Sequence, residues 1–236
     1  KVQFDFLTHR PENEKKDYDD EIRSLGGKIY HMPVLNPFSP SYMKSLDRFF
    51  KEHKEYKIVH SHLDCLSAYP LKAAKKNGVP VRIAHSHNTS QEKNLKYLIK
   101  DYSKKQIPKY ATHLFACGKE AGKWMFGKHK FQIMNNAIDA KKFIYNEEVR
   151  KQKRAELGVE DKFVIAHVGR FNLQKNHEFL VKRFADFAKT NEDAVLVLIG
   201  NGELQEKIKE MAKEYGIETK VKFLGLREDI PQLLQA

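Results

Sequence analysis

The chain has 236 residues, of which 41% are hydrophobic and 31% charged, a composition typical of a globular protein. Its two cysteines exclude a disulfide scaffold and a four-thiolate metal site and fit a reducing cytoplasm, and no apolar run approaches the ~20 residues of a membrane span. The net charge of +12 lies entirely within residues 1–145, which predicts an anionic partner there, either nucleic acid or membrane, unless the lysines only form a solvated surface.

Short apolar runs alternate with amphipathic stretches along the chain. Strands are predicted at 2–8, 27–32, 57–62, 81–86, 113–117 and 131–135, and again at 163–168, 194–199 and 220–224. Helical spacing of apolar residues predicts helices at 41–53, 66–76, 176–189 and 203–215. Strand–helix alternation of this kind predicts an α/β fold built from βαβ units with parallel sheets.

The two series of strands are separated by a polar stretch around residues 141–153. This break predicts two α/β domains, 1–145 and 146–236. The chain begins inside a strand pattern and ends inside a helical pattern, so we expect both domains to be incomplete at the chain ends. Ligands of open α/β sheets bind at the carboxyl ends of the strands, which directs attention to the residues just after each strand.

Residues 168–176 carry the clearest local signal. A predicted buried strand ends at Gly169, Arg170 and Lys175 follow within six residues, and a helix is expected to begin near Asn176. Backbone N–H groups and the positive end of a helix dipole favour an anion, Arg adds a bidentate fork and Lys a point charge. The segment therefore predicts a phosphate or diphosphate site, the alternative being a surface loop capped by Asn176.

The tripeptide His-Ser-His occurs twice, at 60–62 and at 85–87, each time at the end of a predicted strand. Residues i and i+2 of an extended segment share a face, so each pair of imidazoles can act together. Three interpretations are compatible with this pattern. The histidines form a hydrogen-bonding site for a hydroxylated ligand, bind a metal together with Asp64, or have a structural role.

Two segments with glycines carry weaker signals. Residues 200–202, Gly-Asn-Gly, follow a predicted strand and permit either close backbone approach to a ligand or a plain turn. Residues 122–128 have the spacing of a P-loop, but His129 stands where Ser or Thr would bind Mg²⁺. We therefore reject residues 122–128 as a P-loop that binds a nucleoside triphosphate.

A lysine-rich segment runs from residue 93 to residue 130, where ten lysines stand against two acidic residues. Within it, Leu95, Leu98, Ile99 and Tyr102 fall at helical spacing. A basic amphipathic helix of this kind can lie on an anionic membrane surface. The alternative is that its apolar stripe packs on the domain core.

Several of these segments together resemble glycosyltransferase family 4, which has the GT-B fold of two Rossmann-like domains. Residues 169–176 resemble the donor-site signature of that family, and residues 84–89 resemble the strand end that carries its active-site histidine. Residues 133–139 resemble its interdomain segment, with Asn and Ala in place of Pro and Gly. Residues 200–202 and 221–225 resemble its next two turns. The pattern is similar to the branch that builds capsular polysaccharides and exopolysaccharides.

The resemblance implies roles for particular residues. It assigns the donor diphosphate to Gly169, Arg170 and Lys175, and the nucleotide to Gly202 and Leu226. It implies that the active-site histidine is His87 or His85, and we favour His87. The family's first N-terminal strand, its acceptor loop and its Glu-x7-Glu donor-sugar motif are not found in this chain, so activity is expected of an intact protein that contains them.

The implied activity is that of a retaining glycosyltransferase of cell-surface polysaccharide synthesis. Such an enzyme moves a sugar from a nucleotide-diphosphate sugar to a saccharide acceptor, which is expected to be lipid-linked. Because Arg170 and Lys175 can stabilise the leaving diphosphate, no divalent metal and no other cofactor is expected. A front-face reaction in which His87 contacts the donor sugar is implied. The expected location is the cytoplasm, peripheral at the inner face of the plasma membrane.

Two other classes of protein are compatible with some of these residues. The basic half could bind nucleic acid, but the chain lacks a helix-turn-helix, zinc-finger or RNP-like pattern, so we expect no nucleic-acid partner. The His-Ser-His pairs could serve a zinc-dependent hydrolase, which would retain its metal on purification.

Overall fold

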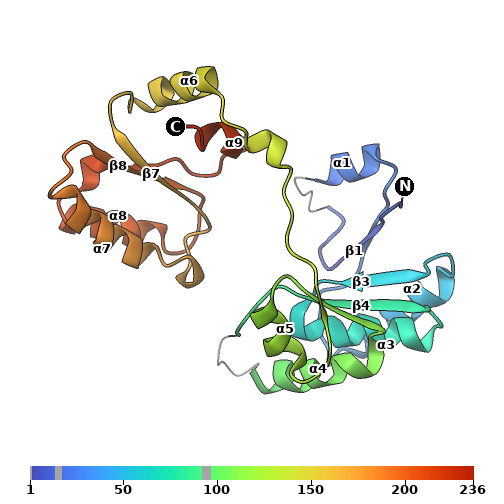
Figure 1. Cartoon of the computed structure of the whole chain (residues 1–236). Coiled ribbons are helices and arrows are strands. Elements are labelled where there is room, and N and C mark those ends of the chain that lie inside the picture. Colours follow the sequence, from blue (N-terminus) through green and yellow to red (C-terminus); the bar gives the residue numbers. More distant parts are fainter. Residues whose placement is uncertain (1, 14–17, 92–96) are drawn as a thin grey trace. The chain divides into compact units, whose positions relative to one another are not determined.

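The computed structural model describes residues 2–13, 18–91 and 97–236, which form two compact units, Lys1–Ala137 and Ile138–Ala236 (Figure 1). The division lies inside the segment that resembles an interdomain segment. The boundary predicted between residues 145 and 146 falls within the second unit, just before α6 (Glu147–Leu157). Residues beside this point belong to the second unit because Arg150 Nη1 donates to the backbone oxygens of Gln235 and Ala236, at 2.7 and 2.8 Å.

The first unit contains two parallel sheets. One pairs β1 (Phe6–Thr8) with β2 (Ile29–His31), and the other has the order β3 (Ile58–Ser61), β4 (Val81–Ser86), β5 (His113–Ala116) and β6 (Gln132–Ile133). The helices are α1 (Asp19–Ser24), α2 (Pro40–Glu52), α3 (Ala68–Lys76), α4 (Tyr97–Tyr110) and α5 (Lys119–Phe126), and the 3₁₀ turns are η1 (Asp64–Ser67) and, in the second unit, η2 (Ala140–Phe143).

Helix α2 illustrates how the sequence determines these elements. Ser39 accepts a hydrogen bond from the backbone N–H of Tyr42 at 3.3 Å, and Pro40 occupies the first turn, where its missing N–H costs nothing. The buried side chains of α2 recur at helical spacing and are Tyr42, Leu46, Phe49 and Phe50. They form a core cluster with Ala73 and Ala74 of α3. The apolar period therefore decides which face of α2 is buried.

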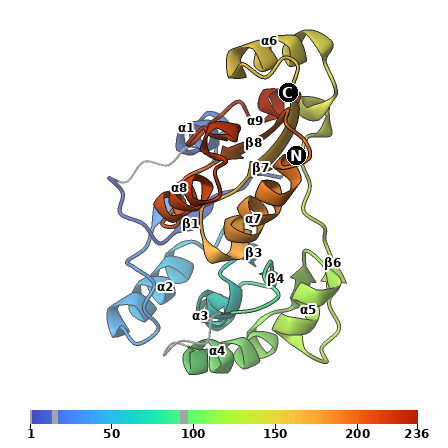
Figure 2. The same ribbon diagram turned by 90° about the vertical axis from the view of Figure 1, so that its left-hand side faces the viewer.

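The second unit has one parallel sheet of three strands, β7 (Phe163–Val168), β8 (Ala194–Ile199) and β9 (Val221–Phe223), in that order. Its helices are α6, α7 (His177–Ala188), α8 (Gln205–Glu214) and α9 (Ile230–Leu233), with 3₁₀ turns η3 (Leu173–Lys175) and η4 (Glu218–Lys220). Helices α7 and α8 contact each other and lie side by side in Figure 2.

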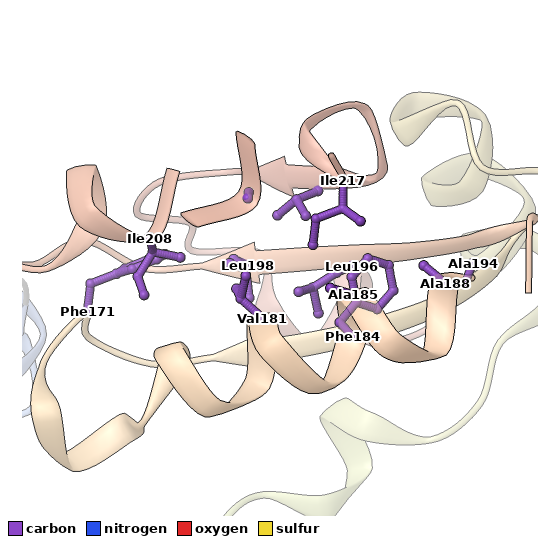
Figure 3. Packing of buried hydrophobic residues seen from close by; sticks show 12 residues of the cluster. Phe171, Val181, Phe184, Ala185, Ala188, Ala194, Leu196, Leu198, Ile208 and Ile217 are labelled. Atoms are coloured by element: carbon purple, nitrogen blue, oxygen red, sulfur yellow. The ribbon is translucent and has the colours of Figure 1, made fainter. Parts of the chain in front are cut away.

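Strand β8 is buried along its whole length because side chains cover both faces of the sheet. On one face, Leu196 and Leu198 pack with Val181 and Phe184 of α7 (Figure 3). On the other face, Val195, Val197 and Ile199 pack with a cluster that includes Leu157 and Leu233. A central parallel strand covered on both faces reads as a continuous apolar run, which is the pattern seen in the sequence.

All nine predicted strands are present, most of them shorter than predicted at one or both ends, and the α/β class with parallel sheets is confirmed. Among the described residues, the helices are too short or too polar to cross a membrane.

Candidate functional site

Three turns meet at the carboxyl ends of β7, β8 and β9. The N–H of Gly169 donates to the carbonyl of Ile199 at 2.9 Å, and the N–H of Gly200 donates to the carbonyl of Gly225 at 2.8 Å. The parallel sheet thereby brings Gly169, Gly200 and Gly225 to one edge, although they are far apart in the sequence. Leu226 follows directly and is 77% exposed.

Gly200 and Gly202 are required by contacts between these turns. A Cβ at Gly200 would overlap the carbonyl oxygen of Gly169, and the φ of Gly200 is +134°. A Cβ at Gly202 would lie 2.5 Å from the carbonyl oxygen of Phe171. Phe171 also donates its N–H to Asn201 O at 3.0 Å. The two glycines therefore permit a close backbone approach between the turn after β8 and the turn after β7.

Lys175 lies across the end of β7. A Cβ at Gly169 would be 3.0 Å from Lys175 Cδ, so the aliphatic part of the lysine covers the glycine. Lys175 ends η3, whose N-terminus is capped by Asn172: the side-chain Oδ1 accepts from the N–H of Lys175 at 3.1 Å. The structure thus brings Lys175 to Gly169, as the phosphate-site prediction requires.

Asn176 does not act as the side-chain cap considered in the sequence analysis. It has a left-handed backbone, with φ 51°, and separates η3 from α7. Its side chain makes no capping hydrogen bond within the described part of the chain. The first backbone amides of α7 therefore do not donate to the Asn176 side chain. Since the N-terminus of a helix carries a partial positive charge, these amides favour the binding of an anion.

Arg170 pairs with Glu203, a residue that the sequence analysis did not single out. The distance from Arg170 Nη2 to Glu203 Oε2 is 3.1 Å, and both side chains are more than half exposed. Ion pairs this exposed contribute about 0–1 kcal/mol. Glu203 follows Gly202 directly, so its position after the second turn was the available signal. An anionic ligand with several oxygens can replace this carboxylate at low cost.

Two histidines packed against this turn were also missed, one of them buried and the other partly exposed. His177, only 1% exposed, stacks on Phe171 with ring centroids 4.2 Å apart and meets His167 edge-on at 4.6 Å. Burial lowers the pKa of His177, assisted by His167 and Lys175. Burial and Lys175 lower the pKa of His167 likewise. Both imidazoles are thus kept neutral at pH 7 and support the turn by packing.

The two His-Ser-His tripeptides come together in the first unit, at the carboxyl ends of β3 and β4. His60 Nε2 lies 3.1 Å from His85 Nδ1, and His62 Nδ1 lies 2.8 Å from His87 Nε2. The ring centroids of neighbouring histidines are 4.2–5.2 Å apart. We call His60, His62, His85 and His87 the histidine cluster. His60 and His85 are inner, and His62 and His87 are exposed.

The inner histidines of the cluster are kept uncharged. Burial, followed by repulsion from His62, His85 and His87, lowers the pKa of His60 to about 4. Burial, followed by repulsion from His87 and His62, lowers the pKa of His85 to about 4. At neutral pH these imidazoles therefore accept hydrogen bonds or bind a metal as neutral ligands.

Asp64 does not join the histidine cluster in the described structure. The ligand atoms of His60, His62 and His85 all lie within 4.8 Å of one another, and this group does not include the aspartate. Asp64 Oδ2 instead accepts a hydrogen bond from Asn88 Nδ2 at 2.5 Å. In the described structure Asp64 therefore lies outside this group of ligand atoms.

Acid is expected to destabilise the first unit through the inner histidines. Because His60 and His85 have pKa values below the 6.5 of an unperturbed histidine, the unfolded chain binds protons that the folded chain does not. The full contribution to the free energy of unfolding is therefore present above pH 6.5 and is lost as the pH drops towards 4, by roughly 3–5 kcal/mol after allowance for the partial exposure of His60. Urea unfolding followed by fluorescence of Trp124, the single tryptophan, measures this unit.

The matched control for this expectation is the double variant His60→Gln/His85→Gln, which removes both titrating groups. Its stability should depend less on pH between 6.5 and 4 than that of the parent chain. Equal pH dependence in the two proteins would contradict the assignment.

The lysine-rich segment differs from its predicted arrangement. Leu95, Lys93 and Lys96 lie outside the described residues. In α4 the buried residues are Ser103 and Ile107, whereas Leu98 and Tyr102 are 77% and 64% exposed. The alternative in which this stripe packs on the core is therefore wrong for Leu98 and Tyr102. They share an exposed face with Lys105 and Lys109.

Lys104 does not belong to this exposed face. It is 16% exposed and its Nζ lies 4.8 Å from the centre of the Trp124 ring. The ammonium group is also 3.5 Å from Asp101. These contacts occupy Lys104 within the unit.

The chain is similar in sequence to glycosyltransferases. Residues 148–236 match the family described as Glycosyl transferases group 1. The whole chain is 36% identical to "Putative glycosyltransferase EpsF" of Bacillus subtilis (strain 168), and it spans 63% of the length of that protein. A segment covering 41% of the chain is 32% identical to 24% of a Campylobacter jejuni enzyme, N-acetylgalactosamine-N,N'-diacetylbacillosaminyl-diphospho-undecaprenol 4-alpha-N-acetylgalactosaminyltransferase.

Solved structures share the fold. The crystal structure of HepE from Anabaena in complex with UDP and glucose superposes with a TM-score of 0.80 at 17% identity. The superposition covers the whole of this chain and 72% of that one. The likeness at this level of identity is one of architecture, that of the GT-B fold.

Proposed function

We propose that the chain is part of a group 1 glycosyl transferase, one of the family 4 enzymes of GT-B fold, and that the intact protein is a retaining glycosyltransferase of exopolysaccharide synthesis. It transfers a sugar from a nucleotide-diphosphate sugar, with UDP as the favoured nucleotide, to a saccharide acceptor. The observation that carries the proposal is the position of Lys175 over Gly169, the residue before Arg170, with only Asn176 between Lys175 and the start of α7.

The chemistry of the donor turn supports this proposal. Breaking the bond between sugar and diphosphate leaves negative charge on the phosphate oxygens. Lys175 contributes a point charge, Arg170 a guanidinium that can leave Glu203, and the first amides of α7 a partial positive charge. Donors held in place before the reaction stabilise charge as it develops. Gly202 and Leu226, at the neighbouring strand ends, are the proposed nucleotide contacts.

His87, or else His85, is the proposed contact to the donor sugar. His87 is exposed at the end of β4, whereas His85 is 5% exposed and paired with His60. An accessible imidazole at the end of a parallel strand suits hydrogen bonding to a sugar hydroxyl, so the accessibility of His87 favours it over His85.

A nucleotide-sugar screen of the full-length protein tests the proposal. Nucleotide release, measured for UDP-, GDP- and ADP-sugars with a saccharide acceptor, should identify a donor. We expect the activity to persist in EDTA, because Arg170 and Lys175 supply the cations. Release that is abolished by EDTA and restored by Mg²⁺ or Mn²⁺ would contradict this mechanism. No release with any donor would contradict the activity itself.

We further propose that the acceptor is lipid-linked and that the first unit works at an anionic membrane surface on the cytoplasmic side. The exposed face of α4 supports this proposal, because it combines Leu98 and Tyr102 with Lys105 and Lys109. Apolar side chains enter the interface, while each nearby lysine contributes about 1 kcal/mol of attraction to anionic lipid. The name of the Campylobacter jejuni relative specifies a diphospho-undecaprenol substrate.

Vesicle sedimentation provides the test of the membrane proposal. Vesicles with anionic lipid should bind the protein at low salt and release it at high salt, and neutral vesicles should bind little. The double variant Lys105→Gln/Lys109→Gln should lose most of this binding. The matched control, Lys182→Gln/Lys213→Gln, removes two exposed lysines from residues 146–236, which carry no net charge. Equal binding to neutral and anionic vesicles, or equal losses in both variants, would contradict the proposal.

A further inference from the structure

The histidine cluster has a composition that sugar binding does not require. One histidine suffices for the proposed donor contact, yet the ends of β3 and β4 bring four imidazoles together. The ligand nitrogens of three of them, His60, His62 and His85, already lie within 4.8 Å of one another. The repeated spacing on adjacent strands places all four rings in one group.

These distances are close to those of a metal site. Zn²⁺ binds imidazole nitrogen at about 2.0–2.1 Å, so ligand nitrogens of a tetrahedral site lie about 3.3 Å apart. The separation of 3.1 Å between His60 Nε2 and His85 Nδ1 is near this value, and a ligand nitrogen of His62 lies within 4.8 Å of both of these histidines. The third ligand, His62, needs only a side-chain adjustment, because its ring is exposed.

The protonation state of the cluster is also that of a ligand set. Metals bind neutral imidazole, and binding competes with protonation. An imidazole with the ordinary pKa of about 6.5 is already mostly neutral above pH 7, so the cluster can act as a ligand set there. Imidazole donors suit Zn²⁺, Cu²⁺ and Ni²⁺, whereas Mg²⁺ and Ca²⁺ prefer oxygen. The chemistry therefore selects a divalent transition metal.

We propose that the histidine cluster binds one Zn²⁺ ion through His60, His62 and His85, with His87 adjacent to the remaining coordination position. Bound Zn²⁺ takes His85 as a ligand and lies beside His87, the imidazole that the proposed function favours for the donor sugar, so it inhibits transfer. The inhibition rests on the proposed function, whereas the metal binding does not. Expected transfer in EDTA and inhibition by Zn²⁺ are consistent, since the ion is not part of the reaction.

Direct metal binding tests the proposal without any assay of transfer. The untagged protein is stripped with EDTA, dialysed and titrated with Zn²⁺ by calorimetry. Titration with Co²⁺ in parallel follows the visible absorption of tetrahedral cobalt. We expect one ion per chain. His62→Ala, which removes an exposed ring, should weaken Zn²⁺ binding at least tenfold, and so should His60→Ala.

The matched control is His113→Ala, which removes an exposed histidine at the start of β5 that lies outside the cluster. It should bind Zn²⁺ as the parent chain does. Fluorescence of Trp124 checks that each variant is folded. No Zn²⁺ binding by the parent chain, or equal affinity in His62→Ala and His113→Ala, would overturn the proposal and leave the cluster as hydrogen-bonded pairs.

The activity arm separates this proposal from the proposed function. Zn²⁺ should inhibit transfer with a midpoint near its measured dissociation constant. The His113→Ala variant should be inhibited at the same Zn²⁺ concentration as the parent chain. A protein that binds Zn²⁺ through the cluster but transfers no sugar would overturn the proposed function alone. Transfer without cluster-dependent metal binding would overturn the metal site alone.

Discussion

Replacing Arg170 or Lys175 with alanine in the full-length protein is expected to lower kcat/KM for sugar transfer about 100- to 1,000-fold. Each variant removes one cation from the turn in which the lysine covers Gly169 and α7 begins. Removing one donor that stabilises developing charge costs roughly 3–4 kcal/mol in the transition state. Initial rates of nucleotide release over a range of donor concentrations measure the effect.

Lys182→Ala is the matched control for these two variants, because it removes an exposed lysine from the middle of α7. Its kcat/KM should stay within a factor of two or three of the parent value. Transfer that is near normal in both Arg170→Ala and Lys175→Ala would refute the diphosphate assignment.

Gly200→Ala is expected to destabilise the second unit by about 3–5 kcal/mol and to abolish donor binding. The new Cβ would overlap the carbonyl oxygen of Gly169, and the φ of +134° is strained for any residue with a side chain. Relief requires the turn at 169–171 to move. Circular dichroism during urea unfolding records both units, and Trp124 fluorescence reports the first alone, so their difference gives the second.

The control for this variant is Gly216→Ala, in the same unit. Gly216 also has a positive φ, of +67°, but a Cβ there would meet no atom within 4 Å among the described residues. It should therefore cost only the backbone strain, about 1–2 kcal/mol, and leave donor binding intact. Equal losses of stability in the two variants would show that contact with Gly169 is unimportant.

The spacing of apolar residues predicted elements such as β8 and α2 well, because their positions depend on which side chains are buried. The six apolar residues of β8 specify a strand covered on both faces, and the spacing of Tyr42, Leu46 and Phe49 specifies the buried face of α2. Which face of α4 is buried was harder to predict. Its sequence contains Leu98 and Tyr102 on one side and Ile107 on another, and only contact with α3, α5 and η1 selects Ile107 for the core.

The candidate site was predicted only where its residues are neighbours in the sequence. Arg170 and Lys175 belong to one turn and could be recognised together. The role of Gly200 depends on a carbonyl thirty-one residues earlier, which no local pattern records. The stacking of His177 on Phe171 and the pairing of Glu203 with Arg170 depend likewise on how the turns pack. Contacts of this kind require the tertiary structure.

The central claim is that the turn from Gly169 to Lys175 receives the diphosphate of the donor. Titration of ¹⁵N-labelled protein with UDP in the presence of EDTA, followed through its backbone amide resonances, tests this claim most directly. The account predicts saturable shifts concentrated at Gly169, Arg170 and Lys175 and in the first turn of α7, with Lys182 at the helix centre little affected. Saturable binding of UDP that leaves these amides unmoved, or the absence of any binding, would contradict it.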